Sequence, residues 1–296
     1  AVLAAAQATA QESAADSGRV SEPVDYEGYT DARYDDWVRE SRYIRVRDGT
    51  RLAADILRPA VDGESVEEPL PVVWTYHRYH RADVREDGSV RAIAAQPIPK
   101  ALLRHGYVVA AVDARGAGAS FGTARGLFAP QEARDTYDVT EWLADRPWSD
   151  GKIGMFGGSY LGVTQLLAAG QAPPHLEAVV PEKVLFDLYR SLRPGGVLAS
   201  DLMRSWSRLT RTLDTKRPAA PVQGDSGRAL LERALEQHRD NLNVYDLYGS
   251  LPYRDGQSAE IALPWLTGSP HTWARRARES DVAVYLMGGW FDGLAR

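Results

Sequence analysis

Short apolar runs alternate along this chain with amphipathic stretches of helical periodicity. Two alternating segments, 42–47 and 51–59, flank the turn residues Asp48-Gly49-Thr50 and predict an antiparallel hairpin. Continuous β-prone runs follow at 70–76 and 107–113. Such runs are typical of strands that are covered on both faces, as in a parallel sheet.

Helices are expected between these strands. One is predicted from about 93 to 105, and another from 130 to about 145, with a proline in its first turn and a second beyond its end. A third helix begins at Ser159, and residues 177–181 predict a short buried strand. Two antiparallel strands followed by strand–helix repeats predict an α/β fold with a mostly parallel, doubly wound sheet and right-handed crossovers.

The pattern changes after about residue 186. Residues 200–215 and 226–241 show helical periodicity with no strand signal between them, which predicts an inserted helical cap. The apolar run 282–287 predicts a last buried strand that returns to the sheet. We therefore divide the chain into a flexible lead (1–25), a core (26–190), a cap (191–280) and a final core strand (281–296).

The most distinctive motif is GGSYLG at 157–162, which follows an apolar run. Glycines beside a serine allow a strand and a helix to meet in a sharp turn that exposes the hydroxyl at the carboxyl edge of the sheet. The motif differs from Gly-x-Ser-x-Gly, because Leu161 occupies the last glycine position and Gly162 follows one residue later. The pattern favours Ser159 as a nucleophile, and an ordinary turn serine is the alternative.

A glycine-rich loop at 114–122 follows the strand at 107–113. A loop of this composition after a strand can cradle a phosphate. Its glycines lack the G-x-G-x-x-G spacing, however, and no Gly-Lys-Ser/Thr follows. A phosphate or dinucleotide site is therefore not favoured, and no cofactor is expected.

Composition narrows the classes of partner. The 296 residues are 44% hydrophobic and 25% charged, which is enough for one large domain with a core. A net charge of −5 without a basic run disfavours nucleic acid and anionic membranes, so a small molecule is the expected partner. No apolar run approaches the roughly 18 residues of a membrane span. The absence of cysteine excludes disulfides, thiolate catalysis and cysteine-based metal sites.

The first ten residues, AVLAAAQATA, are similar to the end of a signal-peptide apolar region with an Ala-x-Ala site at Ala10. This interpretation predicts a secreted or periplasmic protein. An alanine-rich tail on a cytoplasmic protein is the alternative. No initiating methionine or basic segment precedes the run, so we expect that the sequence begins downstream of the natural start.

Four segments occur in the order that one family shows: 113–122, 142–143, 147–162 and 289–293. Together they resemble the X-Pro dipeptidyl-peptidase and cocaine-esterase-like (CocE/NonD) family of serine hydrolases, which includes α-amino-acid ester hydrolases. That family shows the same late glycine after the serine. The resemblance spans roughly residues 40 to 296 and implies an α/β-hydrolase fold. It also implies cleavage of an ester or amide through an acyl-serine intermediate.

In this resemblance, Ser159 matches the nucleophile and Asp292 matches the triad acid at the end of a strand. A serine hydroxyl attacks poorly until a histidine takes its proton, and a carboxylate orients that histidine. The expected chain order is Ser, Asp, His, yet none of the six histidines follows Asp292. We expect the histidine, the rest of the core and a β-rich domain to lie beyond Arg296, and this chain alone to be inactive.

The resemblance assigns half of the oxyanion hole to the backbone N–H of Tyr160 and the other half to a tyrosine hydroxyl. Tyr79 occupies the matching position. His77-Arg78 stand where the family usually has Asn-Pro, and Tyr76 therefore remains a competitor. Either hydroxyl would donate to the negatively charged oxygen of the tetrahedral intermediate.

Two further positions, Asp187 and Trp206, have two explanations each. Asp187 lies about where the amino-acid ester hydrolases place a carboxylate for the substrate ammonium, and a hydrogen bond at the cap hinge is the alternative. Trp206 is a candidate pocket residue, which core packing explains equally well. His77 and His80 lack a third ligand at suitable spacing, so no metal site is expected.

The sequence favours a serine hydrolase that acts on a small ester or a short peptide. One alternative is an X-Pro dipeptidyl-peptidase, which needs an acidic site for the free amine of its substrate. The other is a non-catalytic fragment that binds without turnover, because the triad histidine is absent. The sequence is compatible with either an ester or a peptide substrate. It specifies neither the acyl group nor the oligomeric state.

Overall fold

The computed structural model describes residues 21–22, 25–26, 31–217 and 219–292. The chain divides into two units, residues 1–33 and 34–296. In the first unit, β1 (Ser21–Glu22) pairs antiparallel with β2 (Asp25–Tyr26). The predicted signal-peptide remnant at 1–10 lies outside the described residues.

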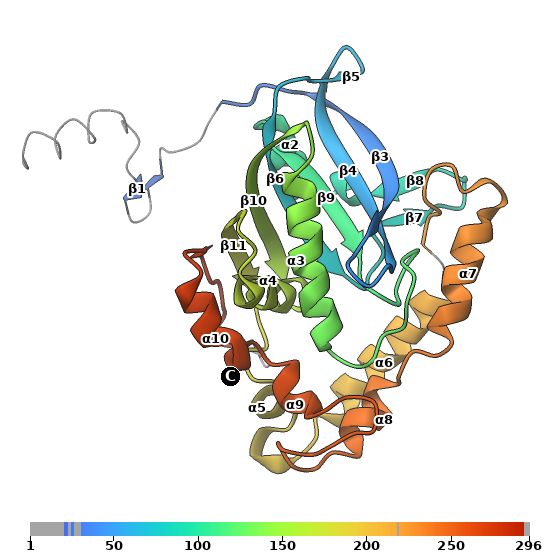
Figure 1. The fold of residues 1–296 in the computed structure, drawn as a ribbon, viewed down its shortest axis with the longest axis vertical. Coiled ribbons are helices and arrows are strands. Elements are labelled where there is room, and N and C mark those ends of the chain that lie inside the picture. Colours follow the sequence, from blue (N-terminus) through green and yellow to red (C-terminus); the bar gives the residue numbers. More distant parts are fainter. Residues whose placement is uncertain (1–20, 23–24, 27–30, 218, 293–296) are drawn as a thin grey trace, which may run out of the picture. The chain divides into compact units, whose positions relative to one another are not determined.

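A single eight-stranded sheet organises the second unit (Figure 1). Its strands are β3 (Asp36–Arg45), β4 (Arg51–Val61), β5 (Glu64–Ser65), β6 (Leu70–His77), β9 (Val108–Asp113), β10 (Ser149–Gly158), β11 (Leu176–Glu182) and β12 (Ala283–Val284). The order is β12-β11-β10-β6-β9-β4-β3, with β5 paired to β4. Strands β12, β11, β10, β6 and β9 run parallel, whereas β3, β4 and β5 pair antiparallel. The predicted α/β fold, including its N-terminal hairpin, is confirmed.

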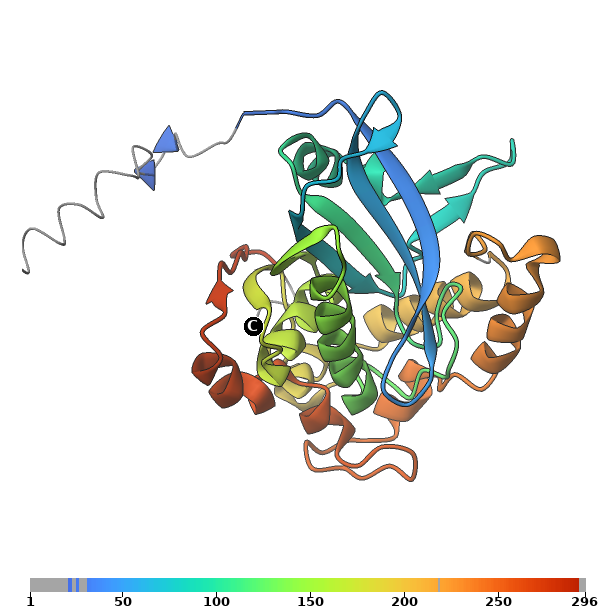
Figure 2. The same cartoon turned by 45° about the horizontal axis from the view of Figure 1, so that its top comes forward.

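Helices cover both faces of this sheet (Figures 1 and 2). On one face lie α3 (Pro130–Ala144) and α4 (Tyr160–Gln171), and α2 (Pro97–Arg104) packs against β9 and β4 on the other. All six residues of β9 are buried: Val108, Ala110 and Val112 belong to one core cluster, and Val109 and Ala111 to another. This alternation explains the apolar run at 108–112, because a strand between two helical layers is packed against apolar side chains on both faces.

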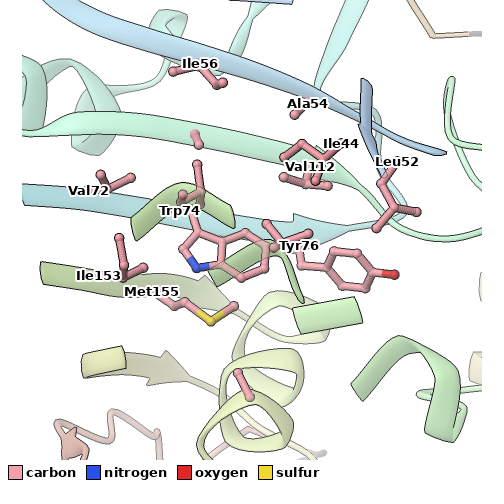
Figure 3. Packing of buried hydrophobic residues seen from close by; sticks show 14 of the residues in the cluster. Ile44, Leu52, Ala54, Ile56, Val72, Trp74, Tyr76, Val112, Ile153 and Met155 are labelled. Carbon is pink, nitrogen blue, oxygen red and sulfur yellow. The ribbon is translucent and has the colours of Figure 1, made fainter. Parts of the chain in front are cut away.

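The larger core cluster lies between the sheet and α3 and α4 (Figure 3). Trp74 of β6 is fully buried near its centre, with Met155 of β10 beside it. Its ring meets that of Tyr76 edge-on, at 6.3 Å between centroids. Burying such large side chains removes much apolar surface from water, which is the main stabilising contribution to the sheet.

Between β11 and β12 the described residues form helices and no named strand. The helices are α5 (Leu188–Leu192), α6 (Ser200–Thr215), α7 (Ala229–His238), α8 (Val244–Gly249), α9 (Pro264–Thr267) and α10 (Pro270–Glu279), with 3-10 turns η2 (Pro194–Gly196) and η3 (Ser226–Arg228). Figure 1 shows α5, α6, α8 and α9 gathered beyond the end of the sheet where β9 finishes. By contrast, α10 packs against α4, where Gly170 allows Trp273 a close approach.

Some predicted elements differ from the structure. The helix expected from 93 begins only at Pro97, after the 3-10 turn η1 (Ile93–Ala95). The hairpin β7 (Ala82–Val84) and β8 (Val90–Ala92) was not predicted. The strand expected to be buried at 282–287 is instead an exposed edge: Tyr285 is 67% exposed, because β11 is the strand's one neighbour among the described residues. Among the residues that the structure describes, no helix has the length and hydropathy that a bilayer crossing requires.

Candidate active site

Ser159 occupies the turn between β10 and α4, at the carboxyl end of the parallel strands. Its φ of 58° and ψ of −121° form a backbone conformation that residues with a side chain rarely adopt. Its backbone N–H donates to the carbonyl oxygen of Glu182 at the end of β11, 2.8 Å away, which holds the turn against the neighbouring strand. The side chain is exposed at this edge of the sheet.

Two glycines allow this turn to pack. A Cβ atom at Gly157, where φ is +122°, would lie 2.8 Å from Leu161 Cβ. A Cβ at Gly162 would lie 2.7 Å from Val184 Cγ1 and 2.8 Å from the carbonyl oxygen of Glu182. Position 162 must therefore be glycine, because α4 crosses the end of β11 there. This explains why the glycine comes one residue later than in Gly-x-Ser-x-Gly.

A cavity of about 430 Å³, part of it open to solvent, lies beside Ser159. Its wall combines core loops with the cap helices α5 and α6. The lining residues are Tyr79, Leu127, Phe128, Ser159, Tyr160, Leu185, Leu192, Leu202, Met203 and Trp206. None of them is charged, so the cavity suits an uncharged, largely apolar group. The structure thus brings together four of the predicted site residues: Ser159, Tyr160, Tyr79 and Trp206.

Tyr79 reaches this cavity from the loop after β6. Its hydroxyl oxygen accepts a hydrogen bond from Trp206 Nε1 at 2.9 Å. Its backbone N–H donates to His77 Nδ1 at 3.1 Å, and the two rings stack with centroids 6.2 Å apart. Its ring also meets Tyr160 edge-on at 6.1 Å. Contacts on several sides therefore fix the tyrosine beside Ser159.

The competing tyrosine, Tyr76, points elsewhere. It is fully buried within β6, and its hydroxyl donates to Asp135 Oδ2 at 3.0 Å while accepting from the backbone N–H of Arg115 at 3.0 Å. It does not line the cavity. The structure therefore places Tyr79, and not Tyr76, next to Ser159.

A buried acid beneath Tyr160 was missed by the sequence analysis. The Tyr160 hydroxyl donates to Glu132 Oε2, in the first turn of α3. Burial raises the pKa of Glu132 to about 7, although the bond from Tyr160 and the charge of Arg78 oppose the shift. Burial likewise raises the pKa of Asp135, which pairs with Arg115, to about 6. An acid in the first turn of a helix resembles an ordinary surface residue, so the sequence carried no distinguishing signal.

Asp292 follows β12 at the same edge of the sheet. Met287 forms a parallel bridge with Glu182, the residue whose carbonyl also receives the Ser159 N–H. Five residues later, Asp292 is partly buried, and its backbone N–H donates to Gly289 at 3.1 Å. The structure shows no direct hydrogen bond between Asp292 and Ser159 among the described residues.

No histidine ring in the described part of the chain hydrogen-bonds Ser159. Four of the six histidine rings hydrogen-bond to other residues: His77 to Tyr79, His80 to Asp83, His175 to Glu141 and His238 to Ser120. Burial lowers the pKa of His77 to about 4, so this ring is neutral near pH 7. Within the described ranges, no group of three His, Asp or Glu side chains is arranged to hold a metal ion.

Asp187 is engaged outside the cavity. Its carboxylate accepts from the backbone N–H of Arg190 at 3.0 Å, which caps α5, and pairs with Arg254 at 2.6 Å. Burial acts to raise its pKa, but the bonds from Arg190 and Arg254 outweigh burial, and the pKa lies below its ordinary value. The hinge hydrogen bond considered as the alternative for this residue is therefore present, and Asp187 does not line the cavity.

Comparisons with known proteins agree with the geometry. Residues 48–296 match the sequence model of the X-Pro dipeptidyl-peptidase (S15) family. A Mycobacterium tuberculosis protein named provisionally as a serine esterase is 30% identical over 90% of this chain and 48% of its own length. Cocaine esterase from Rhodococcus is 36% identical over 57% of this chain and 28% of its own. The chain thus spans about half the length, or less, of the curated relatives it matches.

Solved structures show the same fold. A CocE/NonD family hydrolase from Staphylococcus aureus superposes with a TM-score of 0.58 at 22% identity, covering 88% of this chain and 47% of that one. An α-amino acid ester hydrolase gives a TM-score of 0.55 at 20% identity, covering 91% of this chain and 51% of that one. These likenesses confirm the predicted α/β-hydrolase fold.

Proposed function

Because this chain belongs to the X-Pro dipeptidyl-peptidase (S15) family, we propose that it carries the nucleophile of a serine hydrolase that cleaves carboxylic esters. One observation carries the proposal: Ser159, in a strained strand–helix turn, lines an apolar cavity together with Tyr79. The relatives named as serine esterase and cocaine esterase support an ester substrate.

In the proposed reaction, the Ser159 oxygen attacks the ester carbonyl carbon and its proton passes to a histidine base. The C–O bond to the alcohol then breaks, the base protonates the leaving alkoxide, and an acyl-serine remains. Water, deprotonated by the same base, attacks the acyl-serine and releases the acid. We propose that Asp292 orients this histidine, which comes from outside the described residues.

Two donors would stabilise the negatively charged oxygen that each attack creates. The backbone N–H of Tyr160 belongs to the first turn of α4, where N–H groups have no partner within the helix. The positive end of the helix dipole lies at the same place. The hydroxyl of Tyr79 would be the second donor. Aligned donors of this kind contribute most when they are already fixed in place, and the contacts of Tyr79 meet that condition.

The cavity favours an ester with an uncharged acyl group over an X-Pro peptide. A dipeptidyl-peptidase must hold the ammonium of its substrate, which requires a carboxylate within reach. Among the described residues, no carboxylate lines the cavity, and Asp187 is already paired with Arg254. The peptidase alternative therefore rests on the description of the family alone.

The experiment compares two substrates with the complete gene product. We expect turnover of p-nitrophenyl butyrate that is abolished in Ser159→Ala, and negligible release of p-nitroaniline from Ala-Pro-p-nitroanilide. Ester turnover that survives Ser159→Ala would contradict the proposed nucleophile. Faster cleavage of the X-Pro anilide than of the ester would instead establish the peptidase alternative.

We also propose that the protein is exported. The sequence AVLAAAQATA, with its Ala-x-Ala site, supports cleavage after Ala10. N-terminal sequencing of the protein purified from a culture of its natural host should then begin at Gln11. A mature protein that keeps residues 1–10 would contradict this proposal.

A further inference from the structure

One hydrogen bond joins the cap to the loop that carries Tyr79. Trp206 lies on α6, 127 residues further along the chain, and its Nε1 is 2.9 Å from the Tyr79 hydroxyl oxygen. An indole N–H can only donate. The direction of this bond is therefore fixed: the tyrosine oxygen accepts, and one of its two lone pairs is occupied.

The bond determines where the tyrosine hydrogen is free to point. A phenol has one O–H donor, and that hydrogen cannot be directed at another hydrogen on Trp206. Among the described residues, the Tyr79 hydroxyl donates no hydrogen bond, and Tyr79 lines the same cavity as Ser159. We propose that Trp206 is a positioning residue, which turns the single hydroxyl hydrogen of Tyr79 toward the oxygen that becomes negative during acyl transfer. The proposal rests on the proposed function, in which Tyr79 is an oxyanion donor.

The indole ring is itself held in place. It stacks on Tyr160 with a centroid distance of 6.1 Å and an interplanar angle of 13°. The Arg78 guanidinium lies 5.9 Å from its centroid, and this cation pairs at 3.0 Å with Asp214, two turns further along α6. Both charged side chains are almost completely buried. The geometry that orients Tyr79 is thus built before any substrate arrives, as an effective charge-stabilising site requires.

The hydrogen bond from Trp206 also changes how readily the Tyr79 hydroxyl donates. Burial raises the pKa of Tyr79, which makes its proton harder to share. The bond from Trp206 and the charge of Arg78 oppose this effect, because both stabilise negative charge on the phenol oxygen. A hydroxyl that accepts one hydrogen bond also becomes a stronger donor in the next. Trp206 would therefore both aim and strengthen the donation from Tyr79.

The test is a double-mutant cycle on the complete gene product, with p-nitrophenyl butyrate as substrate. Trp206→Phe removes the N–H, and replacement of Trp206 by benzothienylalanine removes it while keeping the size of the ring. Each change should lower kcat about threefold to tenfold, as expected for one lost hydrogen bond, with KM nearly unchanged. In the Tyr79→Phe background the same changes should have no further effect, because the hydroxyl on which Trp206 acts is gone.

Trp273→Phe is the matched control, since it deletes an indole N–H that donates to the Thr267 carbonyl outside the cavity. Its kcat should stay within about twofold of the parent, as expected for a change that does not touch the donor geometry. Equal losses from Trp206→Phe with and without Tyr79→Phe, or a change in KM alone, would make Trp206 a plain pocket wall and overturn the proposal. A Tyr79→Phe variant with full activity would also overturn it, by removing the oxyanion assignment, while Ser159→Ala reports separately on the proposed nucleophile. Thermal unfolding of each variant shows that it is folded.

Discussion

Tyr160 donates its phenolic hydrogen to Glu132, so the residue that follows Ser159 is anchored by a buried acid on α3. The backbone N–H of the same tyrosine is a proposed donor to the reacting oxygen. Glu132 thus supports the turn from below, through a side chain that never reaches the cavity.

This contact predicts how stability depends on pH. Burial raises the pKa of Glu132 to about 7 in the folded protein, above the ordinary glutamate value of 4.5. Between these values the folded state holds a proton that the unfolded state has released, so the contribution of Glu132 is full below pH 4.5 and is lost as the pH rises through 7. The loss is about 3 kcal/mol at most. Glu132→Gln stays neutral and avoids it.

Urea unfolding between pH 4.5 and 8 checks this prediction. The free energy of unfolding of Glu132→Gln should gain on that of the parent as the pH rises. Glu236→Gln, which replaces an exposed acid on α7, is the control and should show no comparable gain. Parallel pH curves for Glu132→Gln and the parent would mean that folding does not raise the pKa of Glu132, and would contradict the prediction.

Removing the hydroxyl of Tyr79 should affect catalysis, whereas removing that of Tyr76 should affect stability. Tyr79→Phe should lower kcat by about 10²–10³ with little change in KM, because the lost bond forms mainly in the transition state. Tyr76→Phe should instead lower thermal stability, since it removes the donor to Asp135 and the acceptor for the Arg115 N–H. Steady-state kinetics and melting curves of both variants give the answer. The reverse assignment of effects would contradict the placement of the oxyanion donor.

The cavity wall should control the acyl group. Leu202 lies at the rim of the cavity and is 39% exposed, so a larger side chain fits there without straining the core. Leu202→Trp should lower kcat/KM for p-nitrophenyl benzoate much more than for p-nitrophenyl acetate, by about tenfold or more, because only the larger acyl group meets the added ring. Leu209→Trp, on the same helix but outside the lining, is the control. Equal effects on the two esters would show that the acyl group binds elsewhere.

Gly162 should tolerate no side chain. Gly162→Ala places a methyl group 2.7 Å from Val184 Cγ1, so the helix must shift, at a cost of about 1–3 kcal/mol. Gly249→Ala is the matched helical control, because its nearest neighbour would be 3.9 Å away. Without steric conflict, alanine stabilises a helix relative to glycine. A melting temperature that falls for Gly162→Ala and holds or rises for Gly249→Ala is expected, and equal behaviour would contradict the packing argument.

Much of the sheet could be predicted because its strands carry strong local signals. The unbroken apolar run at 108–112 marks a strand covered on both sides, and the structure has one there. Strands β7 and β8 were missed because each has three residues and includes a charged side chain. The segment around Tyr285 was expected to be buried because apolar composition cannot distinguish a central strand from an edge strand.

In the candidate site, too, some features can be predicted from the sequence and others cannot. Ser159 is recognisable because the glycines that its turn needs are its near neighbours in sequence. The bond between Trp206 and Tyr79 joins residues 127 positions apart, so no local pattern could reveal it. Glu132 is indistinguishable in sequence from a solvated acid at the start of a helix. The features of the site that the sequence does not predict are thus contacts between segments that are far apart in the chain.

The most direct test of the central claim is covalent labelling of the nucleophile. The complete gene product is treated with a fluorophosphonate probe, digested and analysed by mass spectrometry. We expect one adduct, on Ser159, that disappears in Ser159→Ala and persists in Ser205→Ala, a control serine exposed on α6. An adduct on another residue, or labelling that survives Ser159→Ala, would contradict the account.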